Sequence, residues 1–258
     1  MEKKTDNYLL FIVLVFVLLF SACTKEDEPV GEAPDDTPDN LIIKPNDFLS
    51  ESRYIKLVVE ITSVQGFEPS AAAVNQMKVF LENRLNKSGG IIIITNSIPS
   101  PGKSSYSLAD IKEIEENYRT SFPEGKTLAA WFFFADADYA KNEGNSKVLG
   151  IAYSSASMAV FEKTVHEFSG GFWKPAKEIL EETVMKHEFG HILGLVNNGT
   201  EMGKDHQDTS HGHHCNNEDC LMYYAAEHSS GIIDFLSGGS VPALDAQCRE
   251  DLKNNGGK

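Results

Sequence analysis

Residues 184–194 of this chain read VMKHEFGHILG and contain the pattern H-E-x-x-H-x-x-G. Positions four apart lie on one face of an α-helix, so His187 and His191 can direct imidazole nitrogens to a single metal ion. Zinc accepts such nitrogens at about 2.0–2.1 Å. Glu188 follows the first histidine, which puts its carboxylate beside a metal-bound water and not on the metal. The pattern predicts a zinc hydrolase site with two ligands and a general base.

The surrounding residues favour a helix over this pattern. Pro175 suits a first helical turn, and apolar residues recur at about helical spacing up to Leu193. Gly194 stands where a helix ends in a left-handed cap. We therefore expect a helix over 175–193, after which the chain can turn back toward the metal. The alternative is an amphipathic helix that carries two ordinary histidines.

A catalytic zinc ion usually has three protein ligands and one open position. Here the sequence resembles the metzincin metallopeptidases, whose motif H-E-x-x-H-x-x-G-x-x-H precedes a turn that contains methionine. The chain departs from that motif at Asn197, three residues after Gly194, because an amide stands where the third histidine belongs. The resemblance implies that a later histidine takes this role.

Residues 214–223 read HCNNEDCLMY, with a methionine eight residues after a histidine. This spacing resembles that of the matrixins, and the part C-x4-C-x-M is similar to the archaemetzincins. The resemblance implies that His214 is the third ligand, after an inserted loop at 198–213. The alternative is His206, followed by His211 or His213. A separate metal site could also be built in this loop from Asp205, His206, Asp208 and His211.

The resemblance assigns further roles. Met222 would form an apolar floor under the metal, and Tyr224 would donate a hydrogen bond to a developing oxyanion. Ordinary packing is the alternative for both. A substrate peptide would pair with an edge strand, for which the candidate residues are Leu149, Gly150, Ile151 and Ala152.

Three cysteines stand in or near the methionine turn region: Cys215, Cys220 and Cys248. Archaemetzincins use such cysteines for a second zinc, but their Cys-x-x-Cys partner is missing here. We expect one disulfide and one buried thiol, with Cys215–Cys220 or Cys220–Cys248 as the pair. The acidic segment 136–143 could bind Ca²⁺, although a solvated turn is the simpler interpretation.

The start of the chain predicts export. Two lysines precede an apolar run from Leu9 to Phe20, which is too short to span a membrane comfortably. The run ends in FSAC, so that residues 1–22 resemble a bacterial lipoprotein signal and Cys23 would carry the lipid. Residues 23–49 are rich in acidic residues and proline and predict a flexible tether. Residues 50–258 suit one catalytic domain.

The net charge is −15, from 23 basic and 38 acidic residues. A chain this acidic is not expected to bind nucleic acid, and the membrane would be contacted through the lipid alone. We expect a monomer at the outer membrane or cell surface of a bacterium that acts on peptides or proteins.

Hydrophobic patterns predict an α+β fold. Strands are expected at 54–62, 90–95, 128–135 and 148–160, and helices at 70–86, 108–118, 175–193 and 244–253. This order predicts a mixed, mostly parallel sheet, and it matches the zincin-like fold that the metzincin resemblance implies, with a loop-rich C-terminal half. The predicted function is that of a zinc-dependent endopeptidase anchored as a lipoprotein. The alternative is an inactive zincin-fold protein that binds a ligand or captures metal.

Overall fold

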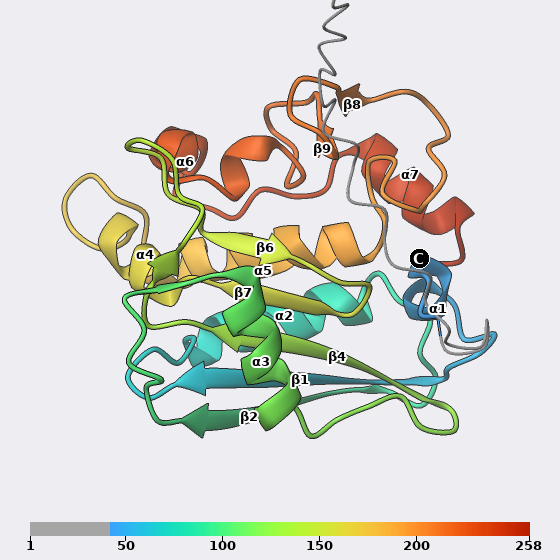
Figure 1. Ribbon diagram of the computed structural model, residues 1–258. Coiled ribbons are helices and arrows are strands. Elements are labelled where there is room, and N and C mark those ends of the chain that lie inside the picture. The colour runs from blue at the N-terminus through green and yellow to red at the C-terminus, as the bar shows by residue number, and fades with distance from the viewer. Residues whose placement is uncertain (1–41) are drawn as a thin grey trace, which may run out of the picture. The chain divides into compact units, whose positions relative to one another are not determined.

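A five-stranded sheet in the order β2-β1-β4-β7-β6 organises the computed structural model, which describes residues 42–258 (Figure 1). Its strands are β1 (Lys56–Val64), β2 (Ile91–Ile98), β4 (Thr127–Phe134), β6 (Gly150–Ala152) and β7 (Ser157–Val160). Four strands are parallel, and β6 runs antiparallel to β7 at the edge. The predicted mixed, mostly parallel sheet is confirmed. The strand expected at 148–160 is instead a hairpin of two short strands.

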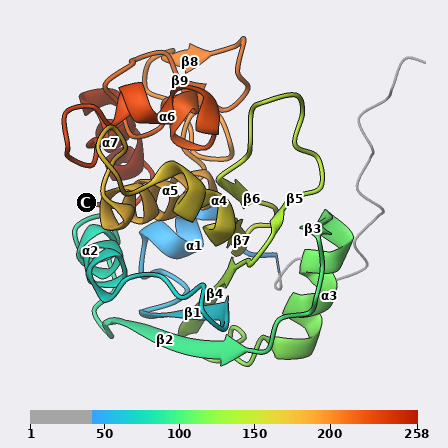
Figure 2. The same ribbon diagram turned by 90° about the vertical axis from the view of Figure 1, so that its left-hand side faces the viewer.

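Alternate residues of β4 face opposite sides of the sheet, as the period of two in a strand requires. Leu128, Ala130, Phe132 and Phe134 enter a core formed with α2 (Ala71–Glu82) and α5 (Lys177–Ile192). Trp131 and Phe133 enter a second core with α3 (Leu108–Tyr118). Figure 2 shows α3 on one side of the sheet and α2 and α5 on the other. The central strand β4 is buried on both faces, which explains the continuous apolar run in its sequence.

The polypeptide after α5 forms a layer on the far side of this helix from the sheet (Figure 1). It consists of β8 (Gln207–Asp208), β9 (His214–Cys215), a 3-10 helix η1 (Tyr224–Ala226), α6 (Ser229–Phe235) and α7 (Ala246–Asn254). The remaining elements are α1 (Pro45–Leu49), β3 (Ser105–Tyr106), β5 (Asp138–Tyr139) and α4 (Glu162–Phe168). The loop-rich C-terminal half with a final helix agrees with the prediction.

The folded unit begins earlier than predicted. Residues 43–258 form one unit, and α1 belongs to it although its sequence was assigned to the tether. Phe48 and Leu49 are fully buried in the main core, and the Asn46 side chain donates a 2.7 Å hydrogen bond to the carbonyl of Asn255. Apolar burial and hydrogen bonds to distant residues thus attach this segment to the domain. The predicted signal, Cys23 and the tether up to residue 41 lie outside the described residues. Within residues 42–258, no helix has both the length and the apolar character needed to cross a membrane.

Candidate metal centre and active site

Helix α5 ends as its sequence predicts. Gly194 adopts φ +74°, a conformation that costs glycine little. Its amide donates to the His191 carbonyl at 3.0 Å, and the amide of Leu195 donates to Gly190 at 3.1 Å. These two bonds form a Schellman motif. The chain therefore reverses immediately after the second histidine of the motif.

The inserted loop brings a third histidine back to the helix. The hydroxyl of Thr200 donates to the Leu193 carbonyl at 2.6 Å, which fixes the start of the loop. Further along, β8 pairs with β9 so that Asp208 lies opposite His214. Asn197 donates to the side chain of Gln207 at 3.2 Å in an exposed contact. The hairpin thus supplies the imidazole that the amide at 197 cannot replace.

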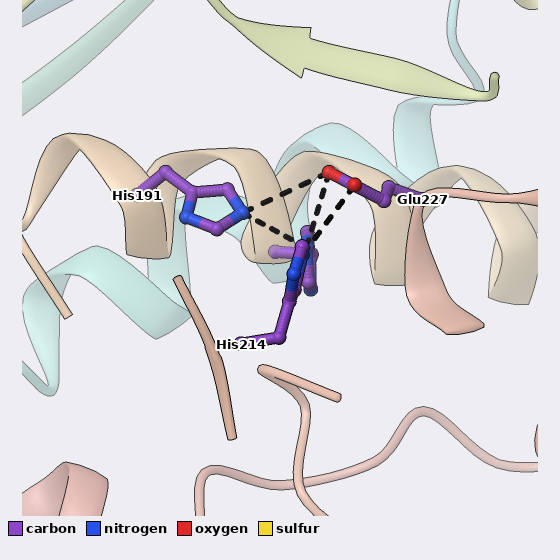
Figure 3. Close-up of side chains that lie close together, drawn as sticks. His191, His214 and Glu227 are labelled. Atoms are coloured by element: carbon purple, nitrogen blue, oxygen red, sulfur yellow. Dashed lines mark hydrogen bonds and ion pairs between the residues drawn. The ribbon is translucent and has the colours of Figure 1, made fainter. Parts of the chain in front are cut away.

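The imidazoles of His187, His191 and His214 converge at one point, and Figure 3 shows His191 and His214 close to Glu227. Nε2 of His187 lies 3.1 Å from Nε2 of His191 and 3.3 Å from Nε2 of His214. On the far side of two of these rings, Nδ1 faces a backbone carbonyl. His187 donates to Leu221 at 2.8 Å, and His214 donates to His211. A proton on Nδ1 leaves the Nε2 lone pair free, so these rings are oriented as metal ligands. Nitrogen donors in this arrangement suit zinc.

The methionine turn packs against α5. Met222 is fully buried and packs so closely on Gly190 that a Cβ there would lie 2.3 Å from the Met222 sulfur. The Met222 carbonyl accepts from the amide of Cys215 at 2.8 Å, which fixes β9 against the turn. Tyr224 lies differently from the expected oxyanion donor. Its ring stacks on His211, with centroids 3.7 Å apart, and its described contacts include none with the three converging imidazoles.

Glu188 lies between the helix and the sheet edge. It is fully buried, and neither carboxylate oxygen makes a standard hydrogen bond within residues 42–258. A Cβ at Gly150 of β6 would lie 2.6 Å from Oε1 of Glu188. Burial, and then the charge of Glu227, raises the pKa of Glu188 well above its usual range, and only the amide of Ala152 opposes this. The carboxylate therefore faces the predicted substrate strand, where the amide of Ala152 is a weak partner.

The predicted substrate strand is the edge strand of the sheet. Leu149 and Gly150 are buried, whereas Ile151 and Ala152 are partly exposed. The amide of Leu149 is already paired with the carbonyl of Glu227 at 2.8 Å. Only the later part of the strand is available to pair with a peptide.

Sequence reasoning missed Glu227. Its Oε2 lies 3.7 Å from Nε2 of His187 and 3.8 Å from Nε2 of His191, and its Oε1 lies 3.5 Å from Nε2 of His214. Burial raises its pKa, but hydrogen bonds from His187, His214 and His228 outweigh burial and lower the pKa of Glu227. Burial lowers the pKa of His214, but Glu227 raises it, and the net result is that the pKa of His214 lies above its usual value. Burial, and then the charge of His187, lowers the pKa of His191. The only sequence signal was an acidic residue five positions after Met222.

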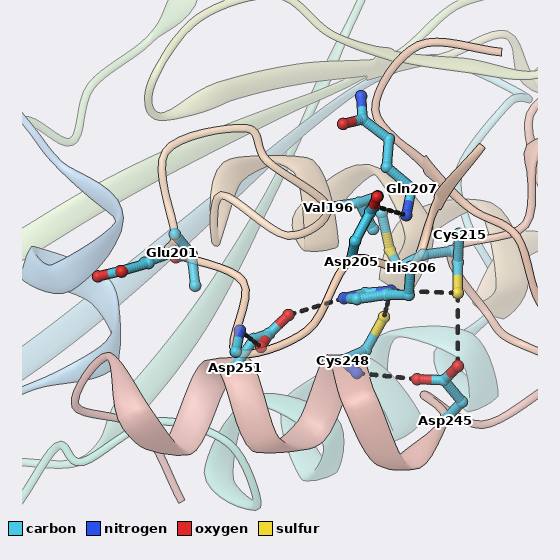
Figure 4. Close-up of polar contacts among 12 residues, drawn as sticks. Val196, Glu201, Asp205, His206, Gln207, Cys215, Asp245, Cys248 and Asp251 are labelled. Atoms are coloured by element: carbon cyan, nitrogen blue, oxygen red, sulfur yellow. Dashed lines mark hydrogen bonds and ion pairs between the residues drawn. The ribbon is translucent and has the colours of Figure 1, made fainter. Parts of the chain in front are cut away.

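A second group of metal-binding side chains lies beside α7 (Figure 4). His206, Cys215, Asp245 and Cys248 each offer a ligand atom within 4.8 Å of the others. Nδ1 of His206 is 3.4 Å from the sulfur of Cys215 and 3.9 Å from that of Cys248, and its Nε2 faces the Asp251 carboxylate at 2.8 Å. His206 is therefore absent from the first centre, where it was the alternative third ligand.

This group corrects the cysteine prediction, because all three thiols are free. The sulfurs of Cys220 and Cys248 are 3.6 Å apart, and a hydrogen bond with Cys215 lowers the pKa of Cys220 to about 4. The backbone amides of Met222 and Asp245 also donate to Cys220, each at 3.4 Å. Sulfurs that converge with one imidazole fit a closed zinc site better than a disulfide. The Asp245 carboxylate of this group also caps α7, accepting from the amide of Cys248 at 2.8 Å.

Two other proposed metal sites are not assembled. Asp138 of the predicted calcium segment forms ion pairs with Lys147 at 3.0 Å and Lys163 at 3.3 Å. In the inserted loop, Asp208 contacts His211 at 2.6 Å while His206 turns into the second group. The oxygens of these segments are therefore occupied by cationic or hydrogen-bonding partners, and no metal-binding group forms from them within the described residues.

No protein-family model and no curated protein matches this chain. Among solved structures, the chain is similar to the archaemetzincin of Methanopyrus kandleri, with a TM-score of 0.50 and 16% identity over 79% of this chain and 96% of that one. Metalloproteinase-II from Bacteroides fragilis is also similar, with a TM-score of 0.42 and 13% identity over 80% of this chain and 54% of that one. The chain therefore has an archaemetzincin-like fold of the zincin type.

Proposed function

We propose that this chain is a zinc-dependent peptidase. The observation that carries the proposal is the Glu188 carboxylate, which is buried without a standard hydrogen-bond partner beside the edge strand, on the helix that carries two of the three converging imidazoles. A purely structural metal site has no use for a buried unpaired carboxylate, which is costly to maintain. A hydrolase needs a base at this place.

His187, His191 and His214 would hold the zinc ion, which when bound supplies Lewis acidity and lowers the pKa of a water molecule. A peptide would pair with the free part of β6, which aligns one of its carbonyls with the site. Glu188 would take a proton from the water as its oxygen attacks the carbonyl carbon. It would deliver that proton to the amine as the C–N bond breaks. Burial raises the pKa of Glu188, which favours its acceptance of a proton.

The test is hydrolysis of a peptide library by the zinc-loaded full-length protein, with new termini identified by mass spectrometry. Glu188→Gln should reduce kcat/KM by about 10²–10⁴-fold, the usual contribution of a general base, while zinc content stays constant. Glu182→Gln, six residues earlier on the same helix, is the control and should retain activity. Equal hydrolysis by the wild type and Glu188→Gln would remove the base from the mechanism.

The second group of side chains supports a second, structural zinc ion bound by His206, Cys215 and Cys248. The fourth ligand would be Asp245 of the same group, or Cys220, whose sulfur lies 3.6 Å from that of Cys248. One observation favours the alternative, an inactive protein. The Glu227 carboxylate lies beside the three imidazoles, where a catalytic zinc site normally leaves one coordination position open. The library experiment separates the two functions, because an inactive protein yields no new termini.

The sequence supports lipid attachment at Cys23 and a position at the outer membrane or cell surface. Mass spectrometry of the N-terminal peptide from membranes should find an acylated Cys23. In Cys23→Ser cells, the protein should move to the soluble fraction. An unmodified N-terminal peptide in the wild type would reject the anchor without affecting the peptidase proposal.

A further inference from the structure

The three imidazoles and Glu227 together form a closed set of four donors. Nε2 of His187 lies 3.1 Å from Nε2 of His191 and 3.3 Å from Nε2 of His214. The carboxylate of Glu227 reaches His187 and His191 with Oε2, at 3.7 and 3.8 Å, and His214 with Oε1, at 3.5 Å. Four ligands at about 2.0–2.1 Å from a zinc ion in a tetrahedron are about 3.3–3.4 Å apart. The set therefore matches a tetrahedral site whose fourth corner is a carboxylate. In catalytic zinc sites, that corner is normally left for water.

The backbone of Glu227 is fixed in this position. Its carbonyl accepts from the amide of Leu149 at 2.8 Å, and the next residue, His228, forms a β-bridge with Val148. The amide of Ser229 donates a 2.8 Å hydrogen bond to the backbone carbonyl of Lys147. These contacts attach residues 227–229 to the chain that leads into β6. The approach of Glu227 to the imidazoles is thus a consequence of the fold.

The side chain, in contrast, has room to leave. It is 19% exposed, and Nε2 of His228 lies 3.2 Å from its Oε1 with that ring 35% exposed. Rotation about the side-chain bonds could move the carboxylate outward while the backbone bonds stay intact. His228 offers it a partner on the solvent side.

We propose that Glu227 is the fourth protein ligand of the metal in the resting protein, and that the site opens when this carboxylate moves aside. The inferred opening of the site rests on the proposed function, because a peptidase needs the fourth coordination position for its substrate. The coordination itself does not depend on turnover. Glu227 would thus make the enzyme latent without a separate inhibitory segment.

The test uses the full-length protein loaded with Co²⁺, whose visible absorption reports coordination. Acetohydroxamate, a small chelator of open metal sites, is titrated and the difference spectrum is recorded. The wild type should need at least tenfold more acetohydroxamate for half-saturation than Glu227→Ala. Glu227→Gln preserves the size of the side chain and should behave like the alanine variant. Glu218→Ala, which removes an exposed carboxylate, should behave like the wild type.

Equal half-saturation in the wild type and both Glu227 variants would overturn the proposal, provided that thermal melts show them folded. This outcome is distinct from failure of the proposed function. If Glu227 is not a ligand, Glu188→Gln can still abolish hydrolysis. If the protein hydrolyses nothing, the cobalt titration still reports whether Glu227 closes the site.

Discussion

Replacing Gly150 by alanine should affect catalysis through a single methyl group. The backbone of Gly150 lies outside the left-handed region, so alanine can adopt it. The added Cβ would lie 2.6 Å from Oε1 and 2.8 Å from Cγ of Glu188, and 2.7 Å from Cγ1 of Val184. All three atoms belong to buried side chains of α5, so they cannot move into solvent. Relief requires that β6 separates from the helix or that the carboxylate shifts.

The magnitude follows from two opposing terms. Overpacking of a core costs about 1–3 kcal/mol, and loss of glycine freedom in the unfolded chain returns about 0.4–1 kcal/mol. A net destabilisation of about 1–2 kcal/mol lowers Tm by about 2–8 °C in a domain of this size. A carboxylate displaced by about 1 Å can lower kcat/KM by about 10²-fold. The expected loss of activity therefore exceeds what partial unfolding could produce at assay temperature.

The assay combines thermal melting with kcat/KM on a peptide that the wild type cleaves. Gly238→Ala is the matched control, because a Cβ there meets nothing within 4 Å and its φ is not positive. Combining Gly150→Ala with Glu188→Gln should add little to the loss caused by Glu188→Gln alone, since both act on one carboxylate. If Gly150→Ala retains kcat/KM within twofold of the control, the assigned contact between β6 and the base is wrong.

Three more predictions concern charge and metal. Because burial raises the pKa of Glu188, the metal-free folded protein keeps a proton that the unfolded chain loses above about pH 4.3. The contribution of this group to stability therefore falls as pH rises from there toward the folded pKa. The Tm of Glu188→Gln in EDTA should fall less over that range, and parallel Tm curves would contradict this. Cys248→Ser should lower the zinc content from two ions per chain to one by elemental analysis, whereas unchanged content would remove the thiol from the second site. Asp251→Ala leaves buried His206 without its 2.8 Å partner and should cost about 1.5–3 kcal/mol in denaturant unfolding, so an unchanged midpoint would count against a structural role for the pair.

The helix with its two histidines could be predicted because local rules determine it. A spacing of four residues aligns His187 with His191. Gly194 ends the helix because its left-handed backbone conformation does not continue the helical turn. The assignment of His214 as the third ligand rests on a resemblance, because this residue lies 22 positions after the last residue of α5 and no local rule fixes such a loop. In the structure, β8 pairs with β9, and this pairing turns the loop back so that His214 lies beside the two histidines of α5.

Other parts of the site depend on contacts that the sequence does not encode locally. Glu227 reaches the imidazoles because its backbone pairs with the chain before β6, and a β-bridge between distant segments leaves no periodic signal. His206 reaches the second group by crossing to α7, where Asp251 holds it. The cysteines were assigned a disulfide because their spacing could not reveal an imidazole from the inserted loop. The buried segment at α1 was missed because a composition rich in proline and acidic residues outweighed Phe48 and Leu49.

The two-residue strand β9 has a consequence for how this protein takes up metal. His214 and the following Cys215 project from opposite sides of one strand, and each belongs to a different metal-binding group. An ion at either centre would be held by a residue of this strand, so that a shift of the strand at one centre also moves a ligand of the other. Occupancy of the two centres should therefore be cooperative, and the coupling must act equally in both directions. Partial chelation would then leave a mixture of fully loaded and empty chains, with few that hold a single ion.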